Sequence, residues 1–327
     1  MYKLANNFSK EQALELLASE RFARRTVSFY RYVRIPDPNA FRNSLYANFA
    51  SLRCLGRIYV AREGINAQMN VPEPNWDAFL KILQSYHELH GVPLKIAVEQ
   101  GESFWKLTIK VRNQIVADGL PEGTYDITNV GTHLTASEFN RLAEAPDTLI
   151  VDMRNAYESE IGHFENALLP KAATFKEELP LVKQALENHR GKKILLYCTG
   201  GIRCEKASAY LKHEGFENVY QLHGGIISYA HEIREKRLPS KFKGKNFVFD
   251  ERRAERVTDD VISSCHQCAS PCDSHVNCSY LPCNNLFIQC PACSEKMRGC
   301  CSEACASGVV DGARTHNPWD HNPVLHH

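Results

Sequence analysis

The sequence predicts a multidomain protein of mixed α/β and α+β class, on three observations. Residues 1–118 follow the order strand, helix, hairpin, helix, strand, which is typical of a ferredoxin-like α+β domain. Residues 132–238 alternate short apolar strands with helices, which favours an α/β domain with a parallel sheet. Ten of the 13 cysteines then fall between Cys265 and Cys305, which indicates a separate cysteine-rich segment.

Composition narrows the functional classes. Hydrophobic residues make up 43% of the 327 residues, which is enough for packed cores. Because the net charge is only +1 at pH 7, any surface for nucleic acid must be local. The sequence contains no run of 18 apolar residues and no signal-peptide core, so we expect a cytoplasmic protein with no membrane contact. Nothing in the sequence points to a protein partner.

The first domain begins with a predicted helix over residues 9–17, in which Ser9 and Gln12 have capping-box spacing. The remaining elements are expected as a strand at 27–33, a helix at 40–52, strands at 57–60 and 65–71, a helix at 76–89, and strands at 94–98 and 105–111. Arg57, Arg62 and Asn66 on the hairpin allow two interpretations, contact with RNA or simple exposure of polar groups.

The second domain follows a predicted linker over residues 119–131, which contains Gly119, Pro121 and Gly123. Helices are expected at 135–144, 176–188, 205–214 and 226–235, strands at 148–152, 194–197 and 219–222, and irregular structure at 163–170. Since ligands bind where parallel strands end, the candidate site lies near Asp152, Arg154 and Cys198.

Cys198 is the candidate nucleophile, and Arg203 is the candidate charge that activates it. A strand ends on Cys198 and a helix begins near Arg203, so the cysteine should lie at a helix N-terminus, which favours a thiolate. The intervening loop residues are Thr199, Gly200, Gly201 and Ile202, and the glycines allow backbone N–H groups to form an anion nest. The alternative is a buried cysteine that acts only as a small hydrophobe.

Three further residues near this loop each allow two interpretations, one functional and one structural. Asp152 and Arg154 either shape the pocket or form a buried structural ion pair. Cys204 either resolves an oxidised Cys198 through a disulfide or simply packs in the core.

The spacing of the loop distinguishes between families. Four residues separate Cys198 from Arg203, one fewer than in the C-x5-R loop of cysteine phosphatases. Together with segments 149–154, 161–167 and 219–226, the loop resembles rhodanese-like domains, whose loop holds a sulfur atom rather than a phosphate.

A basic linker is predicted over residues 239–262. Its cations alternate with Phe242, Phe247 and Phe249, a composition that suits an RNA backbone and unstacked bases. The candidate RNA contacts are Lys241, Lys243, Lys245, Arg252 and Arg253. The alternative is a solvated strand that happens to be basic.

The cysteine-rich segment, residues 263–306, is predicted to bind structural zinc. Cys265 and Cys268 form one pair with two residues between them, and Cys290 and Cys293 form another, which is the spacing of a four-cysteine zinc site. A second ion could be held by some of Cys272, His275, Cys278, Cys283, Cys300, Cys301 and Cys305, with the pairing left open. Residues 307–327 are expected to be a disordered tail.

The complete arrangement, including the motif at residues 56–66 and the cysteines from Cys265 to Cys278, closely resembles the bacterial tRNA uridine hydroxylase family over about residues 5–305. The resemblance implies oxygen-dependent hydroxylation of the wobble uridine of tRNA to 5-hydroxyuridine, with tRNA as partner, molecular oxygen as co-substrate and Cys198 as the active-site cysteine. The last 20 or so residues do not share this resemblance.

Two other functions stay open at this point. A rhodanese-type sulfurtransferase would carry a persulfide on Cys198, and the loop alone fits that reaction equally well. A noncatalytic rhodanese module that binds RNA or protein is the third possibility, although the intact Cys198 and Arg203 argue against it.

Overall fold

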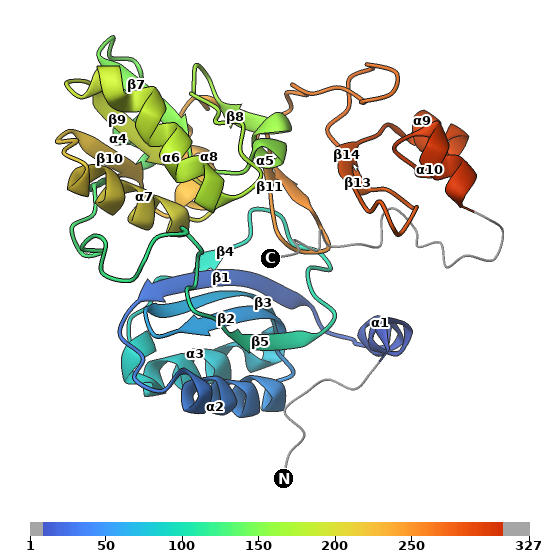
Figure 1. The fold of residues 1–327 in the computed structure, drawn as a ribbon. Helices are drawn as coiled ribbons and strands as arrows, with labels where there is room; N and C mark the ends of the chain where they lie inside the picture. Colours follow the sequence, from blue (N-terminus) through green and yellow to red (C-terminus); the bar gives the residue numbers. More distant parts are fainter. Residues whose placement is uncertain (1–8, 310–327) are drawn as a thin grey trace.

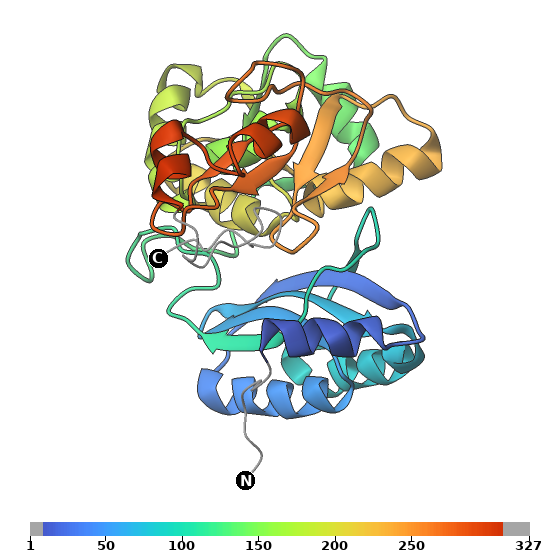
Figure 2. The ribbon, with the colours of Figure 1, turned by 90° about the vertical axis from the view of Figure 1, so that its right-hand side faces the viewer.

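The computed structural model describes residues 9–309. Two α/β bodies are stacked one on the other, and the cysteine-rich segment lies beside the second (Figures 1 and 2). Within these residues, no helix has the length and apolar character needed to cross a bilayer. Most of the tail predicted to be disordered, residues 310–327, lies outside the described residues.

The N-terminal body contains α1 (Lys10–Ala18), β1 (Arg24–Tyr32), α2 (Pro38–Ser51), β2 (Leu55–Ala61), β3 (Gly64–Pro72), α3 (Trp76–Ser85), β4 (Lys95–Ile96) and β5 (Leu107–Val111). The strands form one sheet in the order β4-β1-β3-β2-β5, and from β1 to β4 the chain follows the predicted ferredoxin-like order. The capping box of Ser9 and Gln12 is confirmed. The predicted helix at 76–89 is shorter, because α3 ends at Ser85 and a 3-10 turn (His87–Leu89) follows.

The two faces of this sheet have different roles. Helices α2 and α3 cover one face, where Val27 and Phe29 of β1 join the core (Figure 1). Because side chains alternate along a strand, Tyr30 and Tyr32 lie on the opposite face, toward the second body. The ferredoxin-like body therefore presents tyrosines to its neighbour.

The second body is built on a four-stranded parallel sheet in the order β6-β10-β9-β7. Its elements are β6 (Thr132–Leu134), α4 (Ala136–Ala143), β7 (Thr148–Asp152), α5 (Ala156–Glu160), β8 (Gly162–Phe164), α6 (Phe175–Leu186), β9 (Lys193–Tyr197), α7 (Ile202–His213), β10 (Val219–Leu222) and α8 (Gly225–Lys236). The predicted parallel sheet is confirmed. The sequence prediction missed β6, α5 and β8, which are only three to five residues long.

The predicted basic linker is wrong, because residues 239–262 contain β11 (Phe242–Phe247) and β12 (Ala254–Arg256). Strand β11 lies between β12 and β8 and pairs antiparallel with both. Since β8 belongs to the second body, β11 joins that body. Phe242 and Phe247 are fully buried. This segment is therefore an integral part of the second body rather than a connection.

The cysteine-rich segment has little regular structure. It contains the short hairpin of β13 (His275–Asn277) and β14 (Leu286–Ile288), followed by α9 (Pro291–Lys296) and α10 (Glu303–Gly308). A hairpin and two helices of six residues bury too little apolar surface to be stable alone. Other interactions must therefore hold the segment together.

Candidate functional site

The Cys198 loop has the predicted geometry. Strand β9 ends at Tyr197, Cys198 is fully buried, and α7 begins at Ile202. Gly201 caps the helix with a left-handed φ of 98°, and its N–H donates to Cys198 Sγ at 3.1 Å. The sulfur therefore lies at the N-terminus of a helix of 12 residues, where partial positive charge stabilises an anion.

A second glycine turn packs directly against this loop. Gly224 and Gly225 both have positive φ, and a Cβ on Gly225 would lie only 2.5 Å from the carbonyl oxygen of Cys198. The N–H of Ile226 donates to that same oxygen at 3.0 Å. The close approach of α8 thus fixes the backbone that carries the thiol.

The surroundings of Cys198 favour its ionised form. Burial alone would raise the pKa of the thiol. A hydrogen bond from Cys204, the charge of Arg203, and the N–H groups of both residues outweigh burial and lower the pKa of Cys198 to about 6. Conversely, burial and the neighbouring Cys198 hold the pKa of Cys204 well above its ordinary value. Cys198 is therefore the thiolate of this pair and Cys204 the thiol that donates to it.

The Arg203 side chain is held in place by an ion pair and by hydrogen bonds. Its two terminal nitrogens donate to the carboxylate of Glu158 at 2.6 and 2.9 Å, and one of them also donates to the Thr199 hydroxyl at 3.2 Å. The sequence interpretation missed Glu158, although Asn155 and Glu158 have the capping-box spacing that reveals α5. The pair ties the Cys198 loop to α5.

Asp152 and Arg154 form a buried ion pair, which is one of the two arrangements considered for them from the sequence. Both are fully buried, and Arg154 donates to Asp152 and to the carbonyl of Gly162. Asp152 also accepts from the hydroxyl of Tyr197, the residue before Cys198, at 2.7 Å. The pair stabilises the end of β9, and neither residue lines the two clefts described below.

A cleft of about 1090 Å³ lies between the two bodies, beside the Cys198 loop. Tyr30, Tyr32 and Lys95 line it from the N-terminal body, and Glu205, His133, His223 and Gly224 line it from the other. None of these residues was singled out from the sequence, because their proximity depends on how the two bodies dock. Glu205 and Gly224 flank the Cys198 loop, whereas Cys198 itself is fully buried and does not line the cleft.

Two tyrosines connect the N-terminal body to the loop. Tyr30 donates to Glu205 Oε1 at 2.9 Å, and Tyr32 donates to the carbonyl of Ile202 at 3.2 Å. Lys95 lies 4.3 Å from the centre of the Tyr30 ring. Partial burial lowers the pKa of Lys95 to about 8, although the nearby Cys198 and Glu205 oppose this shift.

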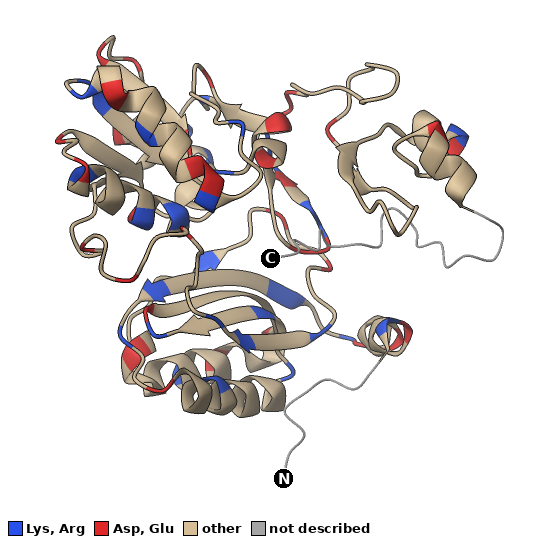
Figure 3. Ribbon diagram, in the orientation of Figure 1, with Lys and Arg blue, Asp and Glu red and all other residues tan. Residues whose placement is uncertain are grey.

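In the segment predicted to contact RNA, two of the three phenylalanine rings are not accessible for stacking on bases. Phe242 and Phe247 are in the core, so the prediction that they meet bases is wrong. The cations around them are mostly engaged, since Lys241 pairs with Glu144, Lys243 with Glu165, Lys245 with Asp273, and Arg252 with Asp250 and Glu255. Arg253 is buried and donates to the carbonyl of His275. Figure 3 shows basic and acidic residues interspersed over both bodies.

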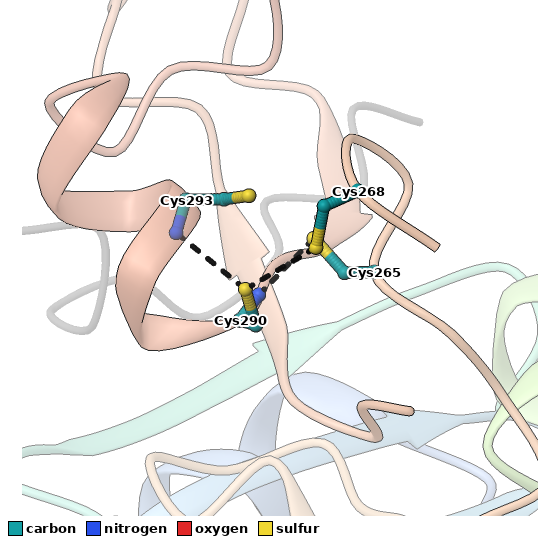
Figure 4. A group of neighbouring side chains, drawn as sticks. All are labelled: Cys265, Cys268, Cys290 and Cys293. Atoms are coloured by element: carbon teal, nitrogen blue, oxygen red, sulfur yellow. Dashed lines mark hydrogen bonds between the residues drawn. The ribbon is translucent and has the colours of Figure 1, made fainter. Parts of the chain in front are cut away.

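The cysteine-rich segment gathers eight of its thiols into two groups. Cys265, Cys268, Cys290 and Cys293 form the first group, as their spacing predicted, and Figure 4 shows them converging from two segments. The second group is Cys278, Cys283, Cys301 and Cys305. Within each group the sulfurs lie within 4.8 Å of one another, and every cysteine is free of a disulfide. Each group could hold a metal ion.

Three of the candidate ligands lie outside both groups. Cys272, His275 and Cys300 are buried in the apolar contacts of the segment instead. Burial, followed by the charges of His266 and Arg253, lowers the pKa of His275 to about 3. The structure thus selects four of the seven residues that the sequence left open.

Comparison with known proteins matches three parts of the chain to family models. Residues 24–115 match the UPF0176 acylphosphatase like domain, residues 135–232 the rhodanese-like domain, and residues 243–306 the rhodanase C-terminal model. A tRNA uridine(34) hydroxylase of Leptospira interrogans is 55% identical over 92% of this chain and 83% of its own. Proteins of the same name from Cronobacter sakazakii and Escherichia coli are 53% and 52% identical, each over 92% of this chain and 87% of theirs.

Proposed function

Since the chain belongs to the tRNA uridine(34) hydroxylase family, we propose that it hydroxylates C5 of uridine 34 in tRNA with Cys198 as the nucleophile. The observation that carries this proposal is the position of Cys198 Sγ, which accepts the Gly201 N–H at the N-terminus of α7. A sulfur held this way is an activated nucleophile. We also infer a cytoplasmic location, which a tRNA substrate supports.

The chemistry explains why a thiolate is needed, since C5 of uracil is too weakly nucleophilic to react with oxygen. Addition of the thiolate to C6 forms a C–S bond and gives an enolate with carbanion character at C5. This carbon attacks O2 and gives a C5 hydroperoxide after protonation. An external two-electron donor, such as a dithiol, then cleaves the O–O bond, leaving C5–OH and water. Loss of the C5 proton and of the thiolate restores the C5–C6 double bond.

The neighbouring residues support these steps in different ways. The Gly201 N–H, the Cys204 thiol and the Arg203 charge keep Cys198 ionised when the base arrives and stabilise it again as it leaves. Glu158 and Thr199 hold the Arg203 side chain, so they are positioning residues.

We propose that each of the two cysteine groups holds a structural zinc ion. A tetrahedral ion with Zn–S bonds of about 2.3 Å keeps its sulfurs roughly 3.8 Å apart. The sulfurs of Cys268 and Cys290 are 3.7 Å apart, those of Cys283 and Cys301 3.7 Å, and those of Cys301 and Cys305 3.8 Å. Four thiolates close the coordination shell, so the ions stabilise the fold rather than take part in the reaction.

The test is nucleoside mass spectrometry of unmodified tRNA incubated aerobically with a dithiol and either the native protein or Cys198→Ala. We expect 5-hydroxyuridine with the native protein and a loss of at least about 10³-fold with the variant, because removing a nucleophile removes the reaction path. Normal hydroxylation by Cys198→Ala would contradict the proposal. Failure to hydroxylate, with intact sulfur transfer from thiosulfate to cyanide, would indicate a sulfurtransferase instead.

A further inference from the structure

The cleft beside the Cys198 loop continues into a second cleft of about 860 Å³. Both are lined by Pro36, Arg62, Glu63, Glu122 and Ile127, so they form one groove along the junction of the two bodies. Together their volumes exceed that of an ordinary small-molecule pocket. The groove offers room for a chain of several units rather than for one small ligand.

Besides Arg31, whose guanidinium donates to the backbone carbonyls of Glu88 and His90, four cations line this groove without an acidic partner. Lys95 and Arg34 line the first cleft, Arg62 lines both clefts, and Arg112 lines the second. Among residues 9–309, none of their side chains forms an ion pair with a carboxylate, and the three arginines are exposed. Lys95 and Arg112 instead lie over the rings of Tyr30 and Tyr59. Their charges are therefore available to an anion.

Most acids of the groove already have partners. Glu205 accepts from Tyr30, His133 and Gln221, and Glu63 and Asp118 both pair with Lys206. Asp37 caps α2, and Asp126 accepts from Thr128. Glu122 is exposed and is the one acidic lining residue, within the described chain, for which the structure records no such contact. These contacts hold the acids in place, whereas Arg34, Arg62 and Arg112 are exposed and have no carboxylate partner, so these arginines are the groups of the groove that can reach an anion.

The basic segment that the sequence predicted to be an RNA-contacting linker, residues 239–262, shows the opposite arrangement. Lys241, Lys243 and Lys245 of that region each end on a carboxylate. Binding a phosphate there would require these pairs to break, which offsets the gain. The groove cations carry no such cost.

We propose that this groove binds the unpaired RNA strand of the anticodon loop, with Arg34 and Arg62 contacting phosphates next to the uridine that approaches Cys198. The inference rests on the proposed function and adds the binding site of its substrate. Arginine is suited to phosphates because its planar group donates two parallel hydrogen bonds. Phosphate contacts position the strand without reading its sequence, and Lys95 would lie next to the base at the end of the groove.

The test measures binding of a fluorescent anticodon stem-loop with uridine 34 at several salt concentrations, using Cys198→Ser protein to prevent turnover. We expect Arg34→Gln/Arg62→Gln to weaken binding by at least about tenfold. The slope of log K against log salt should fall by about 1.4, because each phosphate contact to a single strand contributes about 0.7. The matched control is Lys241→Gln/Lys243→Gln, which removes the same charge and should change affinity less than about twofold.

Glu122→Gln provides a test that does not depend on loss of binding. Removing this exposed acid should tighten binding and leave the salt slope of the arginine contacts in place. Native affinity in the arginine variant, or a larger loss in the lysine control, would overturn the inference, as would absence of stem-loop binding by the parent protein. Groove-dependent binding without hydroxylation by the native enzyme would support the site and contradict only the proposed reaction.

Discussion

Cys198 and the cysteines of the C-terminal segment carry the same thiol in two different surroundings. Cys198 is buried and surrounded by N–H donors, the Cys204 thiol and an arginine, and it has no second thiolate beside it. The eight cysteines of the two groups instead face one another. One surrounding stabilises a single reactive anion, and the other supplies the four ligands of a tetrahedral ion.

The difference shows that supporting contacts, rather than the residue type, decide what a cysteine does. The Cys198 loop is held by the Arg203–Glu158 pair and by the glycine turn before α8. The C-terminal segment has short elements and depends on its proposed ions. Loss of metal should therefore spare the first region and disrupt the second, whereas loss of the ion pair should do the reverse.

The largest effect is expected from removing a metal ligand. Cys268→Ser should reduce bound zinc from two ions per chain to one and open the segment to protease, since structural zinc contributes about 10 kcal/mol or more to folding. Metal analysis and limited proteolysis would measure both. The matched control is Cys272→Ser, which alters a cysteine outside both groups and should retain two ions. Loss of an ion from the control would refute the assignment of ligands.

A smaller but still large effect is expected at the brace of the Cys198 loop. Glu158→Gln removes the only carboxylate with which the buried Arg203 forms an ion pair among the described residues, which should lower the free energy of unfolding by about 3–5 kcal/mol. Urea denaturation would measure the change, and zinc content should stay constant. As control, Glu187→Gln removes half of an exposed ion pair and should cost less than about 1 kcal/mol. Equal losses of unfolding free energy in the two variants would show that the buried Arg203–Glu158 pair does not stabilise the loop.

The smallest effect concerns the hydrogen bond from Cys204. Cys204→Ala should raise the pKa of Cys198 by about one unit, because one hydrogen bond to the thiolate is lost. Since the thiolate is the reactive form, the rise of hydroxylation with pH should shift to higher pH by the same amount. Cys204→Ser keeps a donor and should restore the native profile. A profile unchanged in Cys204→Ala would mean that Cys204 only packs.

Local features were predictable from the sequence and long-range contacts were not. The strand, loop and helix around Cys198 follow from adjacent residues, as does the first cysteine group. Strand β11 was mistaken for a linker because its lysines obscure the buried Phe242 and Phe247, and because its partner β8 lies about 80 residues earlier. The lysines of this segment suggested RNA binding because the carboxylates that pair with them lie elsewhere in the sequence.

The groove illustrates the same limit. Tyr30, Lys95 and Glu205 are far apart in the sequence and meet only because the two bodies dock. The sequence left Arg62 open between contact with RNA and simple exposure on the hairpin, and only the docking of the two bodies places it in the groove.

The most direct test of the central claim is a thiolate titration of Cys198. Ultraviolet thiolate absorbance would be followed against pH in the zinc-loaded native protein and in Cys198→Ser, and the difference between the two curves reports this residue alone. The account predicts one transition with a midpoint near pH 6, with the thiolate present above it. A midpoint near 9, the ordinary value for a cysteine, would show that the loop does not activate Cys198 and would contradict the account.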